Sequence, residues 1–153
     1  MAREVKQIER QLILYDIFQT NDEDTRLSTI RYHLKGITDR TLQRDIRDLT
    51  DAGVLRVYFS RDKGAYINYE EERDISGYSE GIQKRITKKR KKVEEKKEVS
   101  QRKKEHLERL KRLTCLMGQE AYGKANELYF ELFPEATERM RKRDFEVLRH
   151  IGF

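Results

Sequence analysis

A row of long hydrogen-bond donors between residues 38 and 50 has the clearest chemical potential in this sequence. The donors lie along a predicted helix with few apolar residues among them: Arg40, Thr41, Gln43, Arg44 and Arg47. Such a face needs a partner that is rich in acceptors. The major groove of B-DNA admits a helix and displays acceptors of guanine and adenine between flanking phosphates. The pattern favours contact with duplex DNA over the alternative, a solvated helix face.

Two short helices joined by a tight turn must position these donors. The first carries an apolar stripe at helical spacing and ends at Gly36; the stripe is Leu27, Ile30 and Leu34. Thr38 opens the second helix with a hydroxyl suited to N-capping. That helix is expected to bury Leu42, Ile46 and Leu49 opposite the donors and to end at Gly53.

A hairpin and a further helix complete the predicted unit. The runs VLRVYF and AYINY read as strands joined by the turn SRDKG, and they form a wing over residues 54–69. Arg61 and Lys63 at its tip are placed to meet a phosphate or the minor groove. A helix from about Arg3 to Gln19 closes the small core behind. Residues 1–70 are therefore predicted to form a winged helix-turn-helix domain.

The run TDRTLQRDIRDLTDAGVL resembles the recognition-helix signature of DeoR-type and WYL-type bacterial transcriptional regulators, and the likeness covers about residues 4–69. The resemblance implies a transcriptional regulator whose helix Thr38 to Thr50 lies in the major groove. Arg40, Thr41, Gln43 and Arg44 would then lie nearest the bases and Arg47 nearer a phosphate. After residue 70 the sequence has neither a sugar-phosphate sensor domain nor a WYL-type effector domain, so no particular small-molecule effector is implied.

Asp45 stands among the donors and calls for a different role. An acid beside a polyanion is unfavourable, and carboxylates form strong paired hydrogen bonds with arginine. Asp45 is therefore expected to pair with a neighbouring arginine and orient the helix.

The net charge of +6 is unevenly placed along the chain. Residues 84–112 hold 15 basic and five acidic residues, a net charge of +10. Residues 71–104 are expected to form a hinge followed by a basic linker, which is one long helix if Lys84 to Arg112 is continuous. Its KKRKK run, Lys88 to Lys92, fits phosphate contact and a solvated connector equally well.

A partial repeat of the donor helix lies at the C-terminal end. TERMRKRDFEVLRHIGF, Thr137 to Phe153, aligns without a gap with Thr38 to Val54. The matching pairs are Arg40 with Arg139, Arg44 with Arg143, Asp45 with Asp144, Ile46 with Phe145, Leu49 with Leu148 and Gly53 with Gly152. Residues 105–153 are thus predicted to form a three-helix, helix-turn-helix-like module with Phe145 and Leu148 buried. Its second DNA-contact set would be Arg139, Lys142 and Arg143.

Two features of this module leave alternatives open. The sequence stops where a second wing should begin, so the module is either wingless or part of a longer chain. Its aromatic residues also suit dimerisation or docking of a partner, in which case DNA binding would be mainly non-specific. A homodimer through the C-terminal helices is one such arrangement.

Composition excludes several other classes. With 41% charged and 36% hydrophobic residues, the 153-residue chain is expected to form two small cores rather than one large core. The sequence has no nucleophile-base pair, carboxylate pair or phosphate-binding glycine loop, so neither an enzyme nor a cofactor is predicted. His33, His106 and His150 are isolated, which disfavours a metal site. A lone Cys115 and the lack of a membrane-spanning apolar run predict a cytoplasmic protein.

Overall fold

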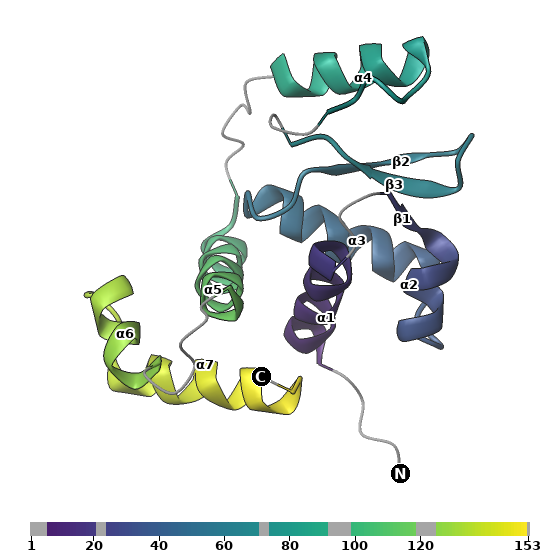
Figure 1. Ribbon diagram of the computed structural model, residues 1–153. Helices are drawn as coiled ribbons and strands as arrows, with labels where there is room; N and C mark the ends of the chain where they lie inside the picture. The colour runs from purple at the N-terminus through teal and green to yellow at the C-terminus, as the bar shows by residue number, and fades with distance from the viewer. Residues whose placement is uncertain (1–5, 21–23, 71–73, 92–98, 119–124, 153) are drawn as a thin grey trace.

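The computed structural model describes residues 6–20, 24–70, 74–91, 99–118 and 125–152. The first half contains α1 Gln7–Thr20, β1 Thr25–Arg26, α2 Leu27–His33, α3 Asp39–Asp51, β2 Val57–Ser60 and β3 Ala65–Asn68. The second half contains α4 Glu80–Lys91, α5 Gln101–Met117, α6 Ala125–Leu132 and α7 Glu138–His150 (Figure 1). The described chain is mainly helical with one small antiparallel sheet, as predicted.

The sheet has the strand order β1-β3-β2. β2 and β3 form the expected hairpin, with Val57 opposite Asn68 and Ser60 opposite Ala65. Gly64 closes the turn with a φ of 60°, a left-handed conformation that glycine adopts without steric cost. The strand β1 was not predicted from the sequence; it pairs Thr25 with Tyr66 and Arg26 with Ala65.

Local signals place α3 where the sequence predicted it. The Thr38 side chain accepts a hydrogen bond from the backbone N–H of Thr41 at 3.3 Å, which satisfies one of the free donors at the helix start. Leu42 and Leu49 are buried. Gly53 follows the helix with a φ of 77°.

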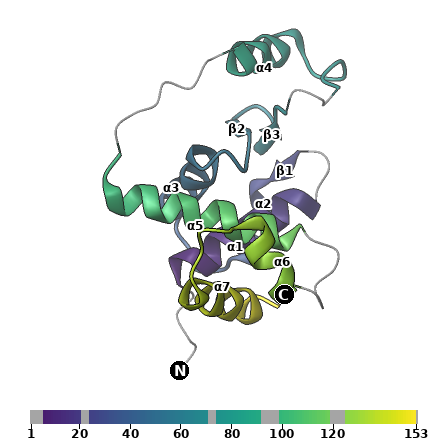
Figure 2. The same cartoon turned by 90° about the vertical axis from the view of Figure 1, so that its left-hand side faces the viewer.

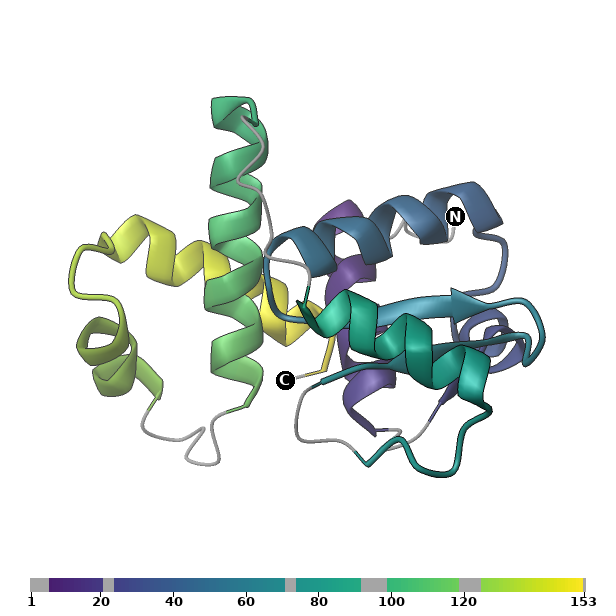
Figure 3. The same cartoon turned by 90° about the horizontal axis from the view of Figure 1, so that it is seen from above.

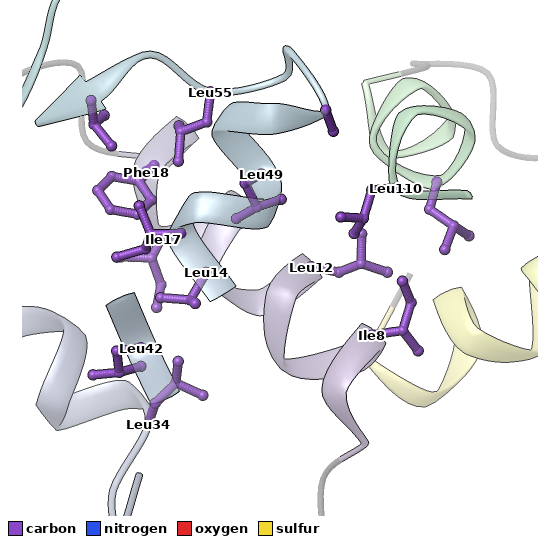
Figure 4. Close-up of a cluster of buried hydrophobic side chains, with 14 of the residues drawn as sticks. Ile8, Leu12, Leu14, Ile17, Phe18, Leu34, Leu42, Leu49, Leu55 and Leu110 are labelled. Carbon is purple, nitrogen blue, oxygen red and sulfur yellow. The ribbon is translucent and has the colours of Figure 1, made fainter. Parts of the chain in front are cut away.

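A single hydrophobic cluster extends from α1, α2 and α3 to α5, α6 and α7. Figure 4 shows the reason: Ile8 and Leu12 of α1 lie beside Leu110 of α5, whereas Leu14 and Phe18 lie toward α3 and the hairpin. α1 thus buries two faces. The expectation of two separate small cores is wrong, because α1 belongs to both groups of helices. Arg3, where this helix was expected to begin, lies outside the described residues.

The long basic connecting helix, which was expected if Lys84 to Arg112 were continuous, is also interrupted. α4 ends at Lys91, and Ser100 caps a new helix by accepting a hydrogen bond from the backbone N–H of Lys103 at 3.2 Å. α4 packs across the hairpin (Figure 3), where Ile82 and Ile86 cluster with Ile67. The sparse apolar stripe of α4 therefore covers the sheet, and α5 joins the main cluster separately.

Candidate nucleic-acid interface

The outward face of α3 presents the predicted donors. Arg40, Gln43, Arg44 and Arg47 are exposed, as is the capping residue Thr38, while Thr41 is half-buried. Figure 3 shows α3 along one edge of the molecule. Within the described part of the chain, the three arginines of this face form no ion pair, so their guanidinium groups are available to an external acceptor.

Asp45 lies on the opposite side of α3 and is 1% exposed. Arg10 of α1 forms a bidentate contact with its carboxylate, through Nε to Oδ2 and through Nη2 to Oδ1 at 3.1 Å. Gln11 Nε2 also donates to Oδ1 at 3.3 Å. The predicted pairing of Asp45 with an arginine is confirmed. The contact fixes the rotation of α3 about its axis and so determines which residues face outward.

The other acids of α3 are paired as well. Asp39 accepts from Arg31 Nε at 3.2 Å. Asp48 accepts from Gln11 Nε2 at 2.8 Å, and Asp51 lies 2.9 Å from Lys103 Nζ. The arginines of α3 thus point outward while each of its acids meets a cation or an amide from another helix. A helix that is almost neutral in sequence therefore presents a positive face.

His106 of α5 closes the same inner side of α3. Its Nε2 lies 2.6 Å from Gln11 Oε1 and 4.0 Å from an Asp48 carboxylate oxygen. Burial lowers the pKa of His106, and this effect outweighs the opposing attraction of Asp48. The imidazole is consequently held neutral near pH 7 and acts as a hydrogen-bonding group between α1, α3 and α5.

The two predicted wing residues differ in their surroundings. Arg61 is exposed at the hairpin tip. Lys63 Nζ lies 3.5 Å from an Asp24 carboxylate oxygen and 4.4 Å from the centre of the Tyr78 ring. The charge of Lys63 is therefore partly engaged within the chain, and Arg61 is the freer of the two cations to meet a phosphate.

The cations of the KKRKK run in α4 also differ in their contacts with the rest of the chain. Arg90 donates to the backbone oxygens of Tyr69, at 2.9 Å, and Glu70. Lys89 lies over Tyr58 at 5.5 Å. Lys88 and Lys91 share the outer face of α4 with Lys84, bordering an open hollow. Lys92 lies outside the described residues. Within the described part of the run, Lys89 and Arg90 thus contact the hairpin and the residues that follow it, whereas Lys88 and Lys91 lie on the outer face of α4.

The partial repeat has a structural counterpart in α7. The Thr137 side chain accepts from the backbone N–H of Met140 at 3.2 Å, as Thr38 does for Thr41. Asp144 is 1% exposed and accepts from Arg112 Nε at 3.0 Å and Tyr129 Oη at 2.7 Å. Arg139, Lys142 and Arg143 are exposed. The second predicted set of cations therefore shares one outward surface.

One predicted burial in α7 is wrong. Leu148 is fully buried as expected, but Phe145 is only half-buried. Its ring centre lies 5.6 Å from that of Tyr129 and 5.9 Å from the Arg141 guanidinium carbon. Phe145 exceeds in size the Ile46 that it matches, and it lies at the edge of the cluster.

Sequence reasoning missed the residues that hold α3 in place, above all Arg10, Gln11 and Lys103. Arg10 and Gln11 interrupt the apolar stripe of α1, and this interruption was the available signal. A polar pair within a buried stripe requires partners, because unpaired buried polar groups are costly.

Two further findings on the described residues concern metal ligands and membrane-spanning helices. No group of three His, Cys, Asp or Glu side chains there is arranged to hold a metal ion. No helix in these ranges is both long enough and apolar enough to span a bilayer. Cys115 is a half-buried residue of α5.

Comparison of the chain with protein-family models, with curated proteins and with solved structures finds no match. The resemblance to DeoR-type and WYL-type regulators accordingly stays a prediction.

Proposed function

We propose that this protein is a cytoplasmic DNA-binding transcriptional regulator whose residues 1–70 form a winged helix-turn-helix domain. One observation carries the proposal: α3 directs its arginines outward while Asp39, Asp45, Asp48 and Asp51 are paired with other helices. Duplex DNA matches such a face because phosphates attract its charge and base edges accept its hydrogen bonds.

The side chains of α3 have distinct proposed roles. Arg40 and Arg44 suit bidentate contact with guanine, and Gln43 suits adenine, while the short Thr41 can approach either base. Arg47, nearer the helix end, would meet a phosphate. Arg61 of the hairpin would contact the backbone or the minor groove beside the helix, with Lys63 in support.

Gln43→Ala and Arg44→Ala are expected to weaken binding to a cognate site far more than binding to random duplex DNA. A base contact is typically worth about 1–3 kcal/mol of discrimination, whereas a phosphate contact weakens both kinds of DNA alike. The cognate site would first be selected from a random duplex pool at about physiological salt. Paired titrations then compare the two DNAs.

Arg56→Ala removes an exposed arginine at the base of the hairpin and is the matched control. It should leave the preference for the cognate site unchanged. Equal losses on cognate and random DNA for Arg44→Ala would exclude base reading by that residue. A pool that yields no motif would count against a sequence-specific regulator.

The outer lysines of α4 are expected to contribute non-specific affinity. Replacing Lys84, Lys88 and Lys91 by Gln should reduce the log-log salt dependence of binding by about 0.9 for each phosphate that these lysines neutralise, with cognate preference retained. Arg90 should be kept, because it bonds the backbone after β3. An unchanged slope would show that this face of α4 does not touch DNA.

The alternative function is that of an interaction or architectural protein in which the C-terminal helices dimerise or dock a partner. Phe130 and Leu132 of α6 favour it, since they are 39% and 37% exposed. In that case DNA binding would be mainly non-specific. Sedimentation of the intact chain, with Leu132→Ala as the comparison, tests this alternative.

A further inference from the structure

The sequence repeat extends beyond α3 and α7 to complete three-helix units. Several positions 99 residues apart have matching burial, although the buried Leu12 corresponds to the exposed Lys111. Ile30 of α2 and Tyr129 of α6 are both fully buried, as are Leu14 of α1 and Leu113 of α5. Arg10 corresponds to Arg109, which lies 3.8 Å from Asp144. The unit α5-α6-α7 therefore repeats α1-α2-α3 without an insertion or deletion.

The two units meet through reciprocal contacts. α1 contacts α7 of the other unit, and α5 contacts α3 in return. Asp51 and His150 occupy equivalent positions at the ends of α3 and α7, and each meets the first helix of the other unit: Lys103 at 2.9 Å and Glu9 at 3.1 Å. The exchanged helix pairs indicate an approximate twofold relation, as at the interface of a symmetric dimer. The ionic partners Lys103 and Glu9 are not themselves equivalent positions.

Figure 1 is viewed close to this local axis. α1 and α5 lie at the centre, α3 and α7 on opposite sides of them, and α2 and α6 outermost. In Figure 2, α3 and the first turns of α7 lie toward the same side of the molecule. Both helices therefore lie toward one side of the molecule, as the recognition helices do in a dimeric helix-turn-helix protein whose twofold symmetry matches that of the DNA.

The outward surfaces of α3 and α7 are related but unequal. Arg139 and Arg143 correspond to Arg40 and Arg44, but Lys142 replaces Gln43 and Glu146 replaces Arg47. Lysine binds phosphate as a point charge and lacks the paired donor and acceptor with which glutamine reads adenine. An exposed glutamate beside them disfavours close approach to phosphate. The surface of α7 should therefore bind more weakly and with less sequence preference.

We propose that the chain binds one DNA duplex through both units, as a dimer-like arrangement within a single polypeptide. α3 reads the primary half-site, and α7 contacts a second, weaker half-site about one helical turn away, or about 10 base pairs. This inference rests on the proposed function of α3. It adds a second binding surface, formed by Arg139, Lys142 and Arg143, and predicts an asymmetric site for the intact chain.

The test uses the intact chain, the selected DNA site and two duplex lengths. The long duplex spans both half-sites, and the short one contains only the half-site of α3. Replacing Arg139, Lys142 and Arg143 by Gln should weaken binding to the long duplex by about 10-fold or more, the scale expected when a few DNA-binding side chains are removed. Binding to the short duplex should change less than about 2-fold. The footprint should shorten by about one helical turn.

Two comparison variants separate the inference from the proposed function. Arg149→Gln removes a charge from the exposed last turn of α7 and should have little effect. Replacing Arg40 and Arg44 by Gln should abolish preference on both duplexes. If only this α3 variant loses binding, the proposed function stands and the second surface is refuted. If it binds as wild type, the proposed function fails.

A further outcome would also overturn the single-duplex arrangement. In that outcome, one chain binds two short duplexes at the same time and has no higher affinity for the long duplex. α7 would then contact a separate DNA molecule. Far-ultraviolet circular dichroism of each variant checks that the exposed substitutions leave the helices intact.

Discussion

Asp144→Ala is expected to lower the free energy of unfolding by about 3 kcal/mol, because removing one partner of a buried charged contact leaves the others unpaired. The Asp144 carboxylate accepts from Arg112 Nε at 3.0 Å and from the hydroxyl of the fully buried Tyr129 at 2.7 Å. The value lies at the low end for such contacts, since the Arg112 side chain is 17% exposed and regains some hydration. Urea unfolding at neutral pH measures it.

Glu146→Ala is the matched control, since this acid is exposed on the same helix. It should change the free energy of unfolding by less than about 0.5 kcal/mol. A loss at Asp144 no larger than that at Glu146 would show that the buried contact does not stabilise α7.

A second readout of the Asp144 contact comes from Tyr129. Burial, together with the hydrogen bond and charge of Asp144, raises the pKa of Tyr129 to about 12 from the usual 10.0. A raised folded-state pKa contributes stability that is present below pH 10 and is lost as the pH rises toward 12. In Asp144→Ala the phenolate absorbance should therefore develop at lower pH. An unchanged tyrosine titration would contradict the hydrogen bond.

The sequence was sufficient to predict α3 and α7, because their signals are local. The Thr38 hydroxyl bonds a backbone N–H three residues away, and Gly53 ends the helix by its own conformation. The buried positions Leu42 and Leu49 follow from helical spacing alone. The hairpin was likewise predictable from two strand-like runs and the turn between them.

The arrangement of the helices was not predictable, since it depends on contacts between distant residues. His106 meets Gln11 across 95 positions, and His150 meets Glu9 across 141. In the sequence, Glu9 resembles a residue on the solvent face of a surface helix. Its burial follows only when the second unit covers α1, which merges the two expected cores into one.

The break between α4 and α5 escaped prediction for a related reason. The opposite charges spaced four apart in this region support any helix, so they could not locate its ends. Ser100 supplies the cap for α5, while Ile82 and Ile86 bind α4 to the hairpin. The Ser100 cap and the packing of α4 on the hairpin thus separate two helices where one continuous rod was considered.

The positive face of α3 could be predicted only in part from the sequence. Arg40, Arg44 and Arg47 were visible as donors, but Asp39, Asp48 and Asp51 made the helix almost neutral. The groups that pair with those acids come from other helices, namely Arg31, Gln11 and Lys103. Charge separation across α3 is therefore a property of the folded chain.

Leu148→Ala tests whether the apolar face of α7 is buried within one chain or between two. Leu148 is fully buried in the single chain. Truncating a buried leucine to alanine typically lowers the free energy of unfolding by about 2–5 kcal/mol, because transfer free energy is lost and a cavity remains. The equivalent Leu49→Ala should be destabilised by a similar amount, because both leucines lie in the same hydrophobic cluster.

Urea unfolding at two protein concentrations about a hundredfold apart separates the arrangements, since only a dimer becomes more stable by mass action. We expect equal midpoints at both concentrations for wild type, Leu148→Ala and Leu49→Ala, and sedimentation as a monomer. The exposed Leu132→Ala should leave both measurements unchanged, because Leu132 is 37% exposed in the single chain. The opposite result would be a wild-type midpoint that depends on protein concentration and a Leu132→Ala midpoint that does not. It would place the partner surface on α6. That result would favour the alternative function as an interaction protein, because the exposed surface of α6 around Phe130 and Leu132 would then bind a second copy of the chain.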